Sequence, residues 1–135
     1  MTHRTVRGVF RMILYAAADL IWATKIKGVA DGLGVACRPA RDLAMLEARL
    51  GDCPVSAFLV DLDKGEEALG LIRRAKLGRS DPDARKVRVI AWGPHVQKDL
   101  LQAARDAGAD DVMTRGAFDH SLADLLLKLS ATDSD

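Results

Sequence analysis

The sequence is short of the features that mark several common protein classes. It has only 2 cysteines, Cys37 and Cys53, without a CxxC motif or a neighbouring histidine, so neither a disulfide framework nor a zinc site is indicated. The net charge is only +1, so charge alone indicates no polyanionic partner. No run approaches the roughly 20 apolar residues of a membrane-spanning helix. We therefore expect a cytoplasmic protein with no nucleic-acid or membrane partner.

The chain also has few histidines, the residues most often used in catalysis and metal binding. The chain has 3 histidines, His3, His95 and His120, and none has a nucleophile or a ligand set close in sequence. What the chain does have is 49% hydrophobic and 29% charged residues, a balance typical of a folded globular domain. Its 135 residues suffice for one domain with one core.

The N-terminal stretch has features of an export signal and also of the start of a folded domain. A basic stretch, MTHRTVRGVF, precedes the largely apolar MILYAAADLIWA. Arg11 and Asp19 bracket only seven uncharged residues, and the same run matches a first strand and helix, so we favour the start of the domain. We expect a domain over residues 10–130, with 1–9 and 131–135 as terminal extensions.

Strand and helix patterns alternate along the chain. Apolar runs predict strands at 12–16, 35–38, 55–62, 87–92 and 111–114. Helical spacing predicts helices after Asp19 as a cap, at 41–50 after Pro39, at 65–77, from Pro94 to Gly108, and at 118–130. Apolar residues expected to face the core include Trp22, Leu33, Leu43, Leu46, Leu50, Val96 and Leu100. A polar loop is expected at 78–86, and Trp92 is expected to be a packing residue like Trp22.

Five strand–helix units predict an α/β fold with a parallel sheet and helices on both faces. Because crossovers between parallel strands are right-handed, few arrangements remain. We expect a flavodoxin-like, doubly wound sheet in the order 2-1-3-4-5. This order brings Ala17, Ala18 and Asp19, at the end of the first strand, beside Asp61 at the end of the third.

Three stretches resemble the receiver domains of two-component response regulators. They are ILYAAADLI, FLVDLD and AARDAGADDVMTRGAF, and the resemblance extends over residues 11 to 130. It implies that Asp61 stands where the family has its phosphoacceptor aspartate. The family places two carboxylates that hold Mg²⁺ at the end of the first strand, where this chain has Ala17 and Ala18. Since Mg²⁺ usually needs one or two carboxylates besides the phosphate, we expect no bound metal and no cofactor.

The resemblance also identifies four further departures from the family. Gly93 replaces the hydroxyl residue at the end of the fourth strand, and Val112 replaces the aromatic switch residue. Arg115 stands in place of the lysine that pairs with phosphoryl oxygens, and Gly116 in place of the proline that usually follows it. A guanidinium binds carboxylates well, so we expect a fixed Asp61–Arg115 ion pair that fills the pocket. The alternative interpretation is that Asp61 is a solvated carboxylate without a role.

These residues indicate a degenerate receiver (a pseudo-receiver) without enzyme activity and without an attached DNA-binding domain. It would contact other signalling proteins, or a second copy of itself, through the face that receivers commonly use: residues 95–105, Thr114 and residues 119–128. One alternative is a conventional receiver that a histidine kinase phosphorylates on Asp61.

A second alternative is a phosphohydrolase. FLVDLD also resembles the first motif of haloacid-dehalogenase-type enzymes, with Asp61 as nucleophile, Asp63 as general acid, and Asp110 and Asp111 as later metal-binding acids. Two strand–helix units precede this strand, however, whereas that family begins with it.

Overall fold

The strands form one parallel sheet. The computed structural model describes residues 11–77 and 87–130. The strands are β1 (Met12–Ala16), β2 (Cys37–Pro39), β3 (Val55–Asp61), β4 (Arg88–Gly93) and β5 (Asp111–Thr114). All pairs are parallel and the order is β2-β1-β3-β4-β5, which confirms the predicted topology. β3 occupies the centre and is buried along its whole length, as its unbroken apolar run predicts.

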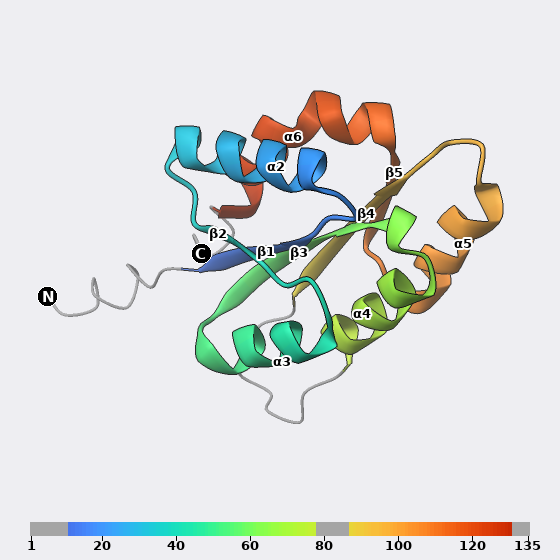
Figure 1. Ribbon diagram of the computed structural model, residues 1–135, viewed down its shortest axis with the longest axis horizontal. Coiled ribbons are helices and arrows are strands. Elements are labelled where there is room, and N and C mark those ends of the chain that lie inside the picture. The colour runs from blue at the N-terminus through green and yellow to red at the C-terminus, as the bar shows by residue number, and fades with distance from the viewer. Residues whose placement is uncertain (1–10, 78–86, 131–135) are drawn as a thin grey trace, which may run out of the picture.

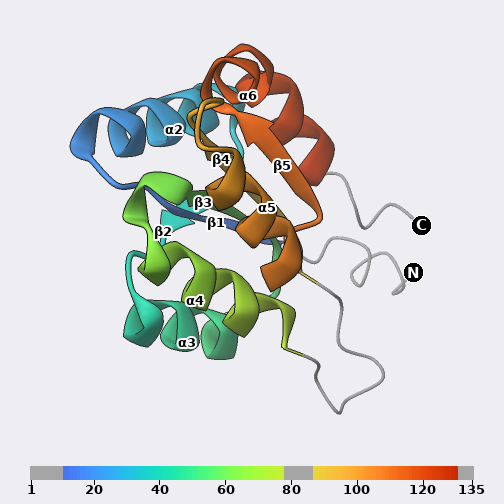
Figure 2. The same ribbon diagram turned by 90° about the vertical axis from the view of Figure 1, so that its right-hand side faces the viewer.

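Helices cover both faces of the sheet (Figures 1 and 2). α2 (Leu20–Leu33) and α6 (Arg115–Ser130) lie on one face. The other face carries α3 (Leu43–Asp52), α4 (Glu66–Lys76) and α5 (Lys98–Ala107). Two separate apolar cores result, one on each side of β3. Leu59 and Trp92 belong to the α2/α6 core, whereas Phe58 and Val60 belong to the other, because successive strand residues point to opposite faces.

The first helix begins as its sequence predicts. The Asp19 side chain accepts a hydrogen bond of 2.9 Å from the Trp22 backbone N–H and caps α2. Gly34 ends the helix with φ of 72°, a left-handed conformation that glycine adopts without strain. Leu33 is exposed at this end, so its predicted place in the core is wrong.

The predicted start of the second helix, at Arg41 directly after Pro39 and Ala40, is wrong. Pro39 is the last residue of β2, and α3 begins only at Leu43. The reason is a side-chain cap, because Asp42 accepts a hydrogen bond of 2.8 Å from the Met45 N–H. Leu43 is then 52% exposed, while Leu46 is fully buried.

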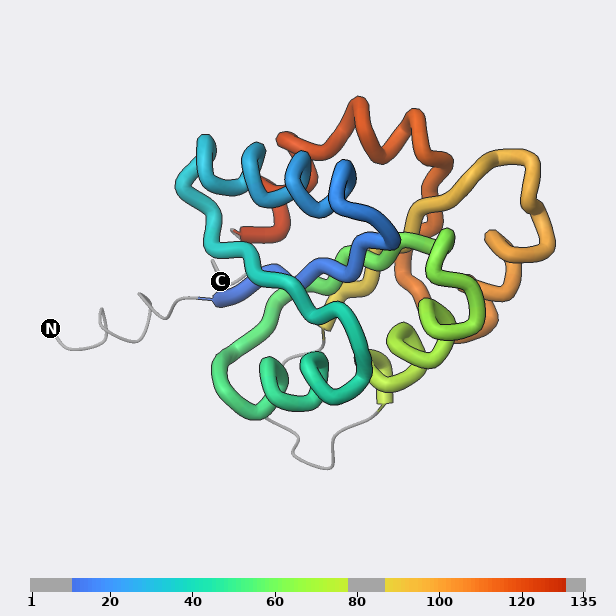
Figure 3. Tube along the Cα trace, viewed as in Figure 1, coloured from blue at the N-terminus to red at the C-terminus, as the bar shows by residue number. Residues whose placement is uncertain are grey.

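The boundaries of the last two helices also differ from the prediction. Figure 3 shows the long path between β4 and α5, where a turn with a hydrogen bond of 3.1 Å from the Gln97 N–H to the Pro94 carbonyl precedes the helix. Val96 is consequently 71% exposed and not in the core. α6 begins at Arg115, directly after β5, because the Thr114 hydroxyl accepts a hydrogen bond of 3.2 Å from the Ala117 N–H.

Some of the predicted segments lie in parts of the chain that the structure does not describe. The predicted loop at 78–86, the two terminal extensions and His3 lie outside the described residues. Among the residues that are described, no helix has the length and apolar character needed to cross a bilayer.

Candidate functional site

Asp61 lies at the carboxyl end of the central strand and is completely buried. Its Oδ2 accepts a hydrogen bond of 2.9 Å from the Ala18 backbone N–H, and its Oδ1 accepts one of 3.0 Å from the Asp63 N–H. The first contact follows from the register, because Ala16 pairs with Val60 and the next residues of both strands therefore lie side by side. Asp61 is thus not the solvated carboxylate of the alternative interpretation.

Burial raises the pKa of Asp61 above its ordinary value of 3.8. The hydrogen bonds from Ala18 and Asp63 act against this change, whereas the negative charges of Asp63 and Asp19 raise the pKa further. Among the described residues no lysine or arginine forms an ion pair with Asp61. The site therefore holds a carboxylate that backbone dipoles stabilise and no cation neutralises.

This pKa shift gives the stability of the protein a testable pH dependence. A carboxyl group whose pKa is higher in the folded state binds more protons there than in the unfolded state, so its contribution to stability is lost as the pH rises through the folded-state pKa. We expect the free energy of unfolding of Asp61→Asn to fall less than that of the unmodified protein between about pH 4 and pH 7. Urea unfolding across this range measures both slopes. Parallel curves for the two proteins would show that Asp61 titrates normally.

Arg115 does not pair with Asp61, so the predicted ion pair is wrong. Its Nη2 donates to Asp63 Oδ2 at 2.5 Å instead. Asp63 lies on the short 3-10 turn η1 (Leu62–Lys64) that follows β3, and its side chain is 36% exposed. Both Asp61 oxygens already accept backbone hydrogen bonds in a buried place, whereas Asp63 offers Arg115 a partner that needs little desolvation.

The ion pair between Arg115 and Asp63 is exposed to solvent, so we expect it to be weak. We expect a double-mutant cycle of Asp63→Ala and Arg115→Ala to give a coupling energy below about 1 kcal/mol, as for other exposed ion pairs. The matched cycle of Asp61→Ala and Arg115→Ala should be additive within error. Thermal or urea unfolding of the six proteins measures both cycles. Strong coupling in the second cycle and none in the first would restore the Asp61–Arg115 pair.

The residues beside Asp61 do not fit Mg²⁺. Ala17 and Ala18 have no oxygen on their side chains, Asp19 caps α2, and Asp63 binds Arg115. Within residues 11–77 and 87–130, no group of three or more His, Cys, Asp or Glu side chains is placed to hold a metal ion. Mg²⁺ prefers octahedral oxygen coordination, and the only buried carboxylate here, that of Asp61, already accepts two hydrogen bonds.

Leu62 packs closely against Gly93, which stands at the place of the missing hydroxyl residue. A Cβ atom on Gly93 would lie 3.1 Å from Leu62 Cβ and 3.3 Å from Leu62 Cδ1, closer than ordinary van der Waals contact. Leu62 is fully buried, and its Cβ is fixed close to the backbone. A serine or threonine at position 93 would therefore press against Leu62. Val112, half-buried on β5, packs against the core under α4 and α5.

An aromatic cluster lies next to the site, and the sequence did not reveal it as a unit. Trp92, the strand partner of Asp61, stacks on Phe118 with ring centroids 4.1 Å apart and planes 3° apart. Trp22 lies against both rings, with centroids at 5.4 and 5.6 Å. The cluster joins β4 and α6, which carry Gly93 and Arg115, to α2, which Asp19 caps. Trp22 and Trp92 are packing residues, as predicted, but only the fold brings Phe118 to them.

Comparison with known proteins gives similarity at the level of structure. No family model matches the sequence, and no curated protein matches it. A response regulator from Thermotoga maritima superposes with a TM-score of 0.69 at 21% identity, covering 91% of this chain and 99% of that one. The receiver domain of a Syntrophus aciditrophicus histidine kinase gives 0.71 at 21% identity, covering 90% and 91%.

A eukaryotic structure is equally similar. A co-crystal structure from Saccharomyces cerevisiae, of the phosphotransfer protein Ypd1 with the receiver domain of Ssk1, matches with a TM-score of 0.73 at 10% identity and covers 94% of this chain and 93% of that one. The match thus extends over nine-tenths of this chain in each case, while the identities are low. The chain has the fold of response-regulator receiver domains.

Proposed function

We propose that this protein is a pseudo-receiver, a signalling module that acts through protein contacts without phosphorylation of Asp61. The observation that carries the proposal is the state of Asp61, which is buried, bonded by two backbone N–H groups and approached by no cation among the described residues. Phosphoryl transfer needs neutralisation of the charge that develops on the phosphoryl oxygens. Here Mg²⁺ has no carboxylate pair, and Arg115 is engaged by Asp63.

The contact face that we propose comprises residues 95–105, Thr114 and residues 119–128. It carries two exposed apolar residues: Val96, in the turn before α5, is 71% exposed, and Leu127, on α6, is 47% exposed. Apolar side chains at the centre of an interface contribute most of its affinity, and charged residues on its rim set specificity. The partner is another signalling protein or a second copy of this chain.

A capture experiment with three variants tests this function. We expect tagged protein to retain the same partners from its source cells when Asp61 is changed to Asn, and to lose them when Leu127 is changed to Asp. Leu43→Asp is the matched control, because Leu43 is 52% exposed on α3, which α4 separates from α5. Quantitative mass spectrometry measures the captured proteins. Loss of the partners in Asp61→Asn would favour the conventional receiver.

The two alternatives fit the structure less well. The conventional receiver is supported by the position of Asp61 at the end of β3, but it requires the metal site for which the oxygen ligands are missing. The phosphohydrolase requires metal-binding acids besides Asp61 and Asp63, and within the described residues no group of three or more His, Cys, Asp or Glu side chains is placed to hold a metal ion. Asp110 is also engaged, since it accepts hydrogen bonds from the Val89 N–H at 2.7 Å and from Lys76 Nζ at 2.9 Å.

A further inference from the structure

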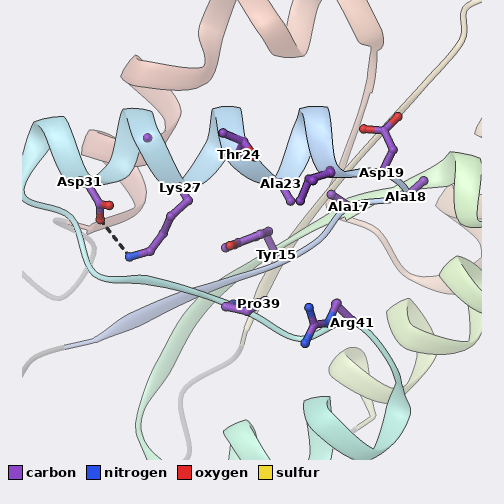
Figure 4. A pocket seen from close by; sticks show the side chains of 12 residues that line it. Tyr15, Ala17, Ala18, Asp19, Ala23, Thr24, Lys27, Asp31, Pro39 and Arg41 are labelled. Carbon is purple, nitrogen blue, oxygen red and sulfur yellow. Dashed lines mark hydrogen bonds and ion pairs between the residues drawn. The ribbon is translucent and has the colours of Figure 1, made fainter.

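A pocket of about 650 Å³ lies beside the Asp61 site, between α2 and the segment that follows β2 (Figure 4). α2 forms one wall with Ala23, Thr24 and Lys27, and Pro39 with Arg41 forms the opposite wall. Tyr15, near the end of β1, lies between the two walls. Pockets of about 300–1,000 Å³ are typical of sites for small organic ligands.

Tyr15 presents its hydroxyl to this pocket. The residue as a whole is only 5% exposed, yet its hydroxyl oxygen, unlike Trp92 Nε1, is not sealed from water. The hydroxyl makes no hydrogen bond with the described residues, so it is available as a donor to a ligand in the pocket.

The pocket also holds a cation that is not neutralised. Lys27 forms an ion pair of 2.9 Å with Asp31, one turn further along α2. Arg41, on the opposite wall, forms no ion pair or hydrogen bond with the part of the chain that the structure describes, and Figure 4 shows its guanidinium beside the pocket. Burial raises the pKa of the Tyr15 hydroxyl, so this group remains a hydrogen-bond donor at neutral pH. The polar groups of the pocket that form no ion pair are thus the Arg41 guanidinium, the Tyr15 and Thr24 hydroxyls, and the Asp19 carboxylate, which accepts the Trp22 N–H at the far end of the α2 wall.

We propose that this pocket binds a small organic anion, with one carboxylate or phosphate group on an apolar body. Arg41 would bond the anionic group through its two-pronged guanidinium, and the Tyr15 hydroxyl would donate a further hydrogen bond. The apolar body would lie against Ala17, Leu20 and Ala23. Leu20 is 78% exposed in the free protein, so a bound ligand would cover apolar surface that now faces water.

The pocket goes beyond the proposed signalling function because it offers an input other than phosphorylation. Ala17 and Ala18 line it, and the Ala18 N–H is one of the two groups that hold Asp61. A ligand in the pocket would therefore contact the segment that fixes the Asp61 carboxylate. This binding needs neither Mg²⁺ nor modification of Asp61, so it can be tested independently of the proposed function.

The test is an NMR titration of the ¹⁵N-labelled protein with three probes of similar size: phenyl phosphate, benzoate and benzyl alcohol. We expect at least one of the two anions to give saturable shifts at the amides of Ala17, Thr24 and Gly28, and the neutral alcohol to bind at least about tenfold more weakly. Comparison of the two anions decides between a phosphate and a carboxylate ligand. Inorganic phosphate alone, without the apolar body, should bind more weakly than phenyl phosphate.

Three variants assign the binding to the named groups. Arg41→Gln removes the free cation and should weaken the better anion about tenfold, and Tyr15→Phe should weaken it several-fold without loss of any contact within the protein. Arg105→Gln is the charge-matched control, because Arg105 is exposed on α5 away from the pocket, and it should leave the affinity unchanged. The absence of saturable shifts for both anions up to about 10 mM, or equal affinities in the Arg41→Gln variant, would overturn the proposal.

Discussion

Incubation with acetyl phosphate and Mg²⁺ is expected to leave the intact mass of this protein unchanged. Small phosphodonors require the acceptor site itself to neutralise the transferred phosphoryl group. Here Ala17 and Ala18 supply no metal ligands, Gly93 offers no hydroxyl and lies in close contact with Leu62, and Arg115 binds Asp63. Intact mass spectrometry distinguishes zero occupancy from the substantial phosphorylation of a working acceptor.

The control for this experiment restores the missing carboxylates. An Ala17→Asp, Ala18→Asp double variant should bind Mg²⁺ more tightly than the unmodified protein, because carboxylate oxygens are the ligands that Mg²⁺ prefers. Shifts of the amides around Asp61 on titration with MgCl₂ measure this gain. A phosphoryl adduct on the unmodified protein that is absent in Asp61→Asn would contradict the pseudo-receiver and establish a conventional receiver.

Replacement of Trp92 by alanine is expected to lower the free energy of unfolding by about 3–5 kcal/mol, the largest effect of any single change considered. Trp92 is fully buried at the centre of the cluster with Trp22 and Phe118, and its removal leaves a cavity bordered by three elements. Urea unfolding followed by circular dichroism measures the loss.

Trp92→Phe is the matched control. It preserves stacking on Phe118 and removes the Trp92 Nε1–H, a buried donor without a hydrogen-bond partner in the structure. We expect Trp92→Phe to lower the free energy of unfolding by less than half as much as Trp92→Ala. The cavity that it leaves is smaller, and removal of the unpaired Nε1–H offsets part of the cost of that cavity. If Trp92→Ala proved no more harmful than Trp22→Ala, the half-buried neighbour, the cluster would not depend on Trp92.

Several helix starts could not be predicted because local hydrogen bonds just before the helix place its first residue. Pro39 and Pro94 are typical first residues of helices, yet α3 and α5 begin four residues after each of them. At α3 the Asp42 carboxylate decides the start, and at α6 the Thr114 hydroxyl does so. Such caps depend on the conformation of the preceding segment, which its tertiary contacts fix.

The sequence by itself determined the order of the elements, the parallel sheet and the placement of Asp61 beside Ala17 and Ala18. Apolar runs identify buried strands, and the right-handedness of crossovers leaves few sheet orders, so these features follow from local pattern and chirality. Only the tertiary structure decided that Arg115 binds Asp63, that Leu62 fills the space beside Gly93 and that Tyr15 faces a pocket with Arg41. Each of these depends on where side chains from separate elements lie within a few ångströms, and that is set by packing of the whole domain.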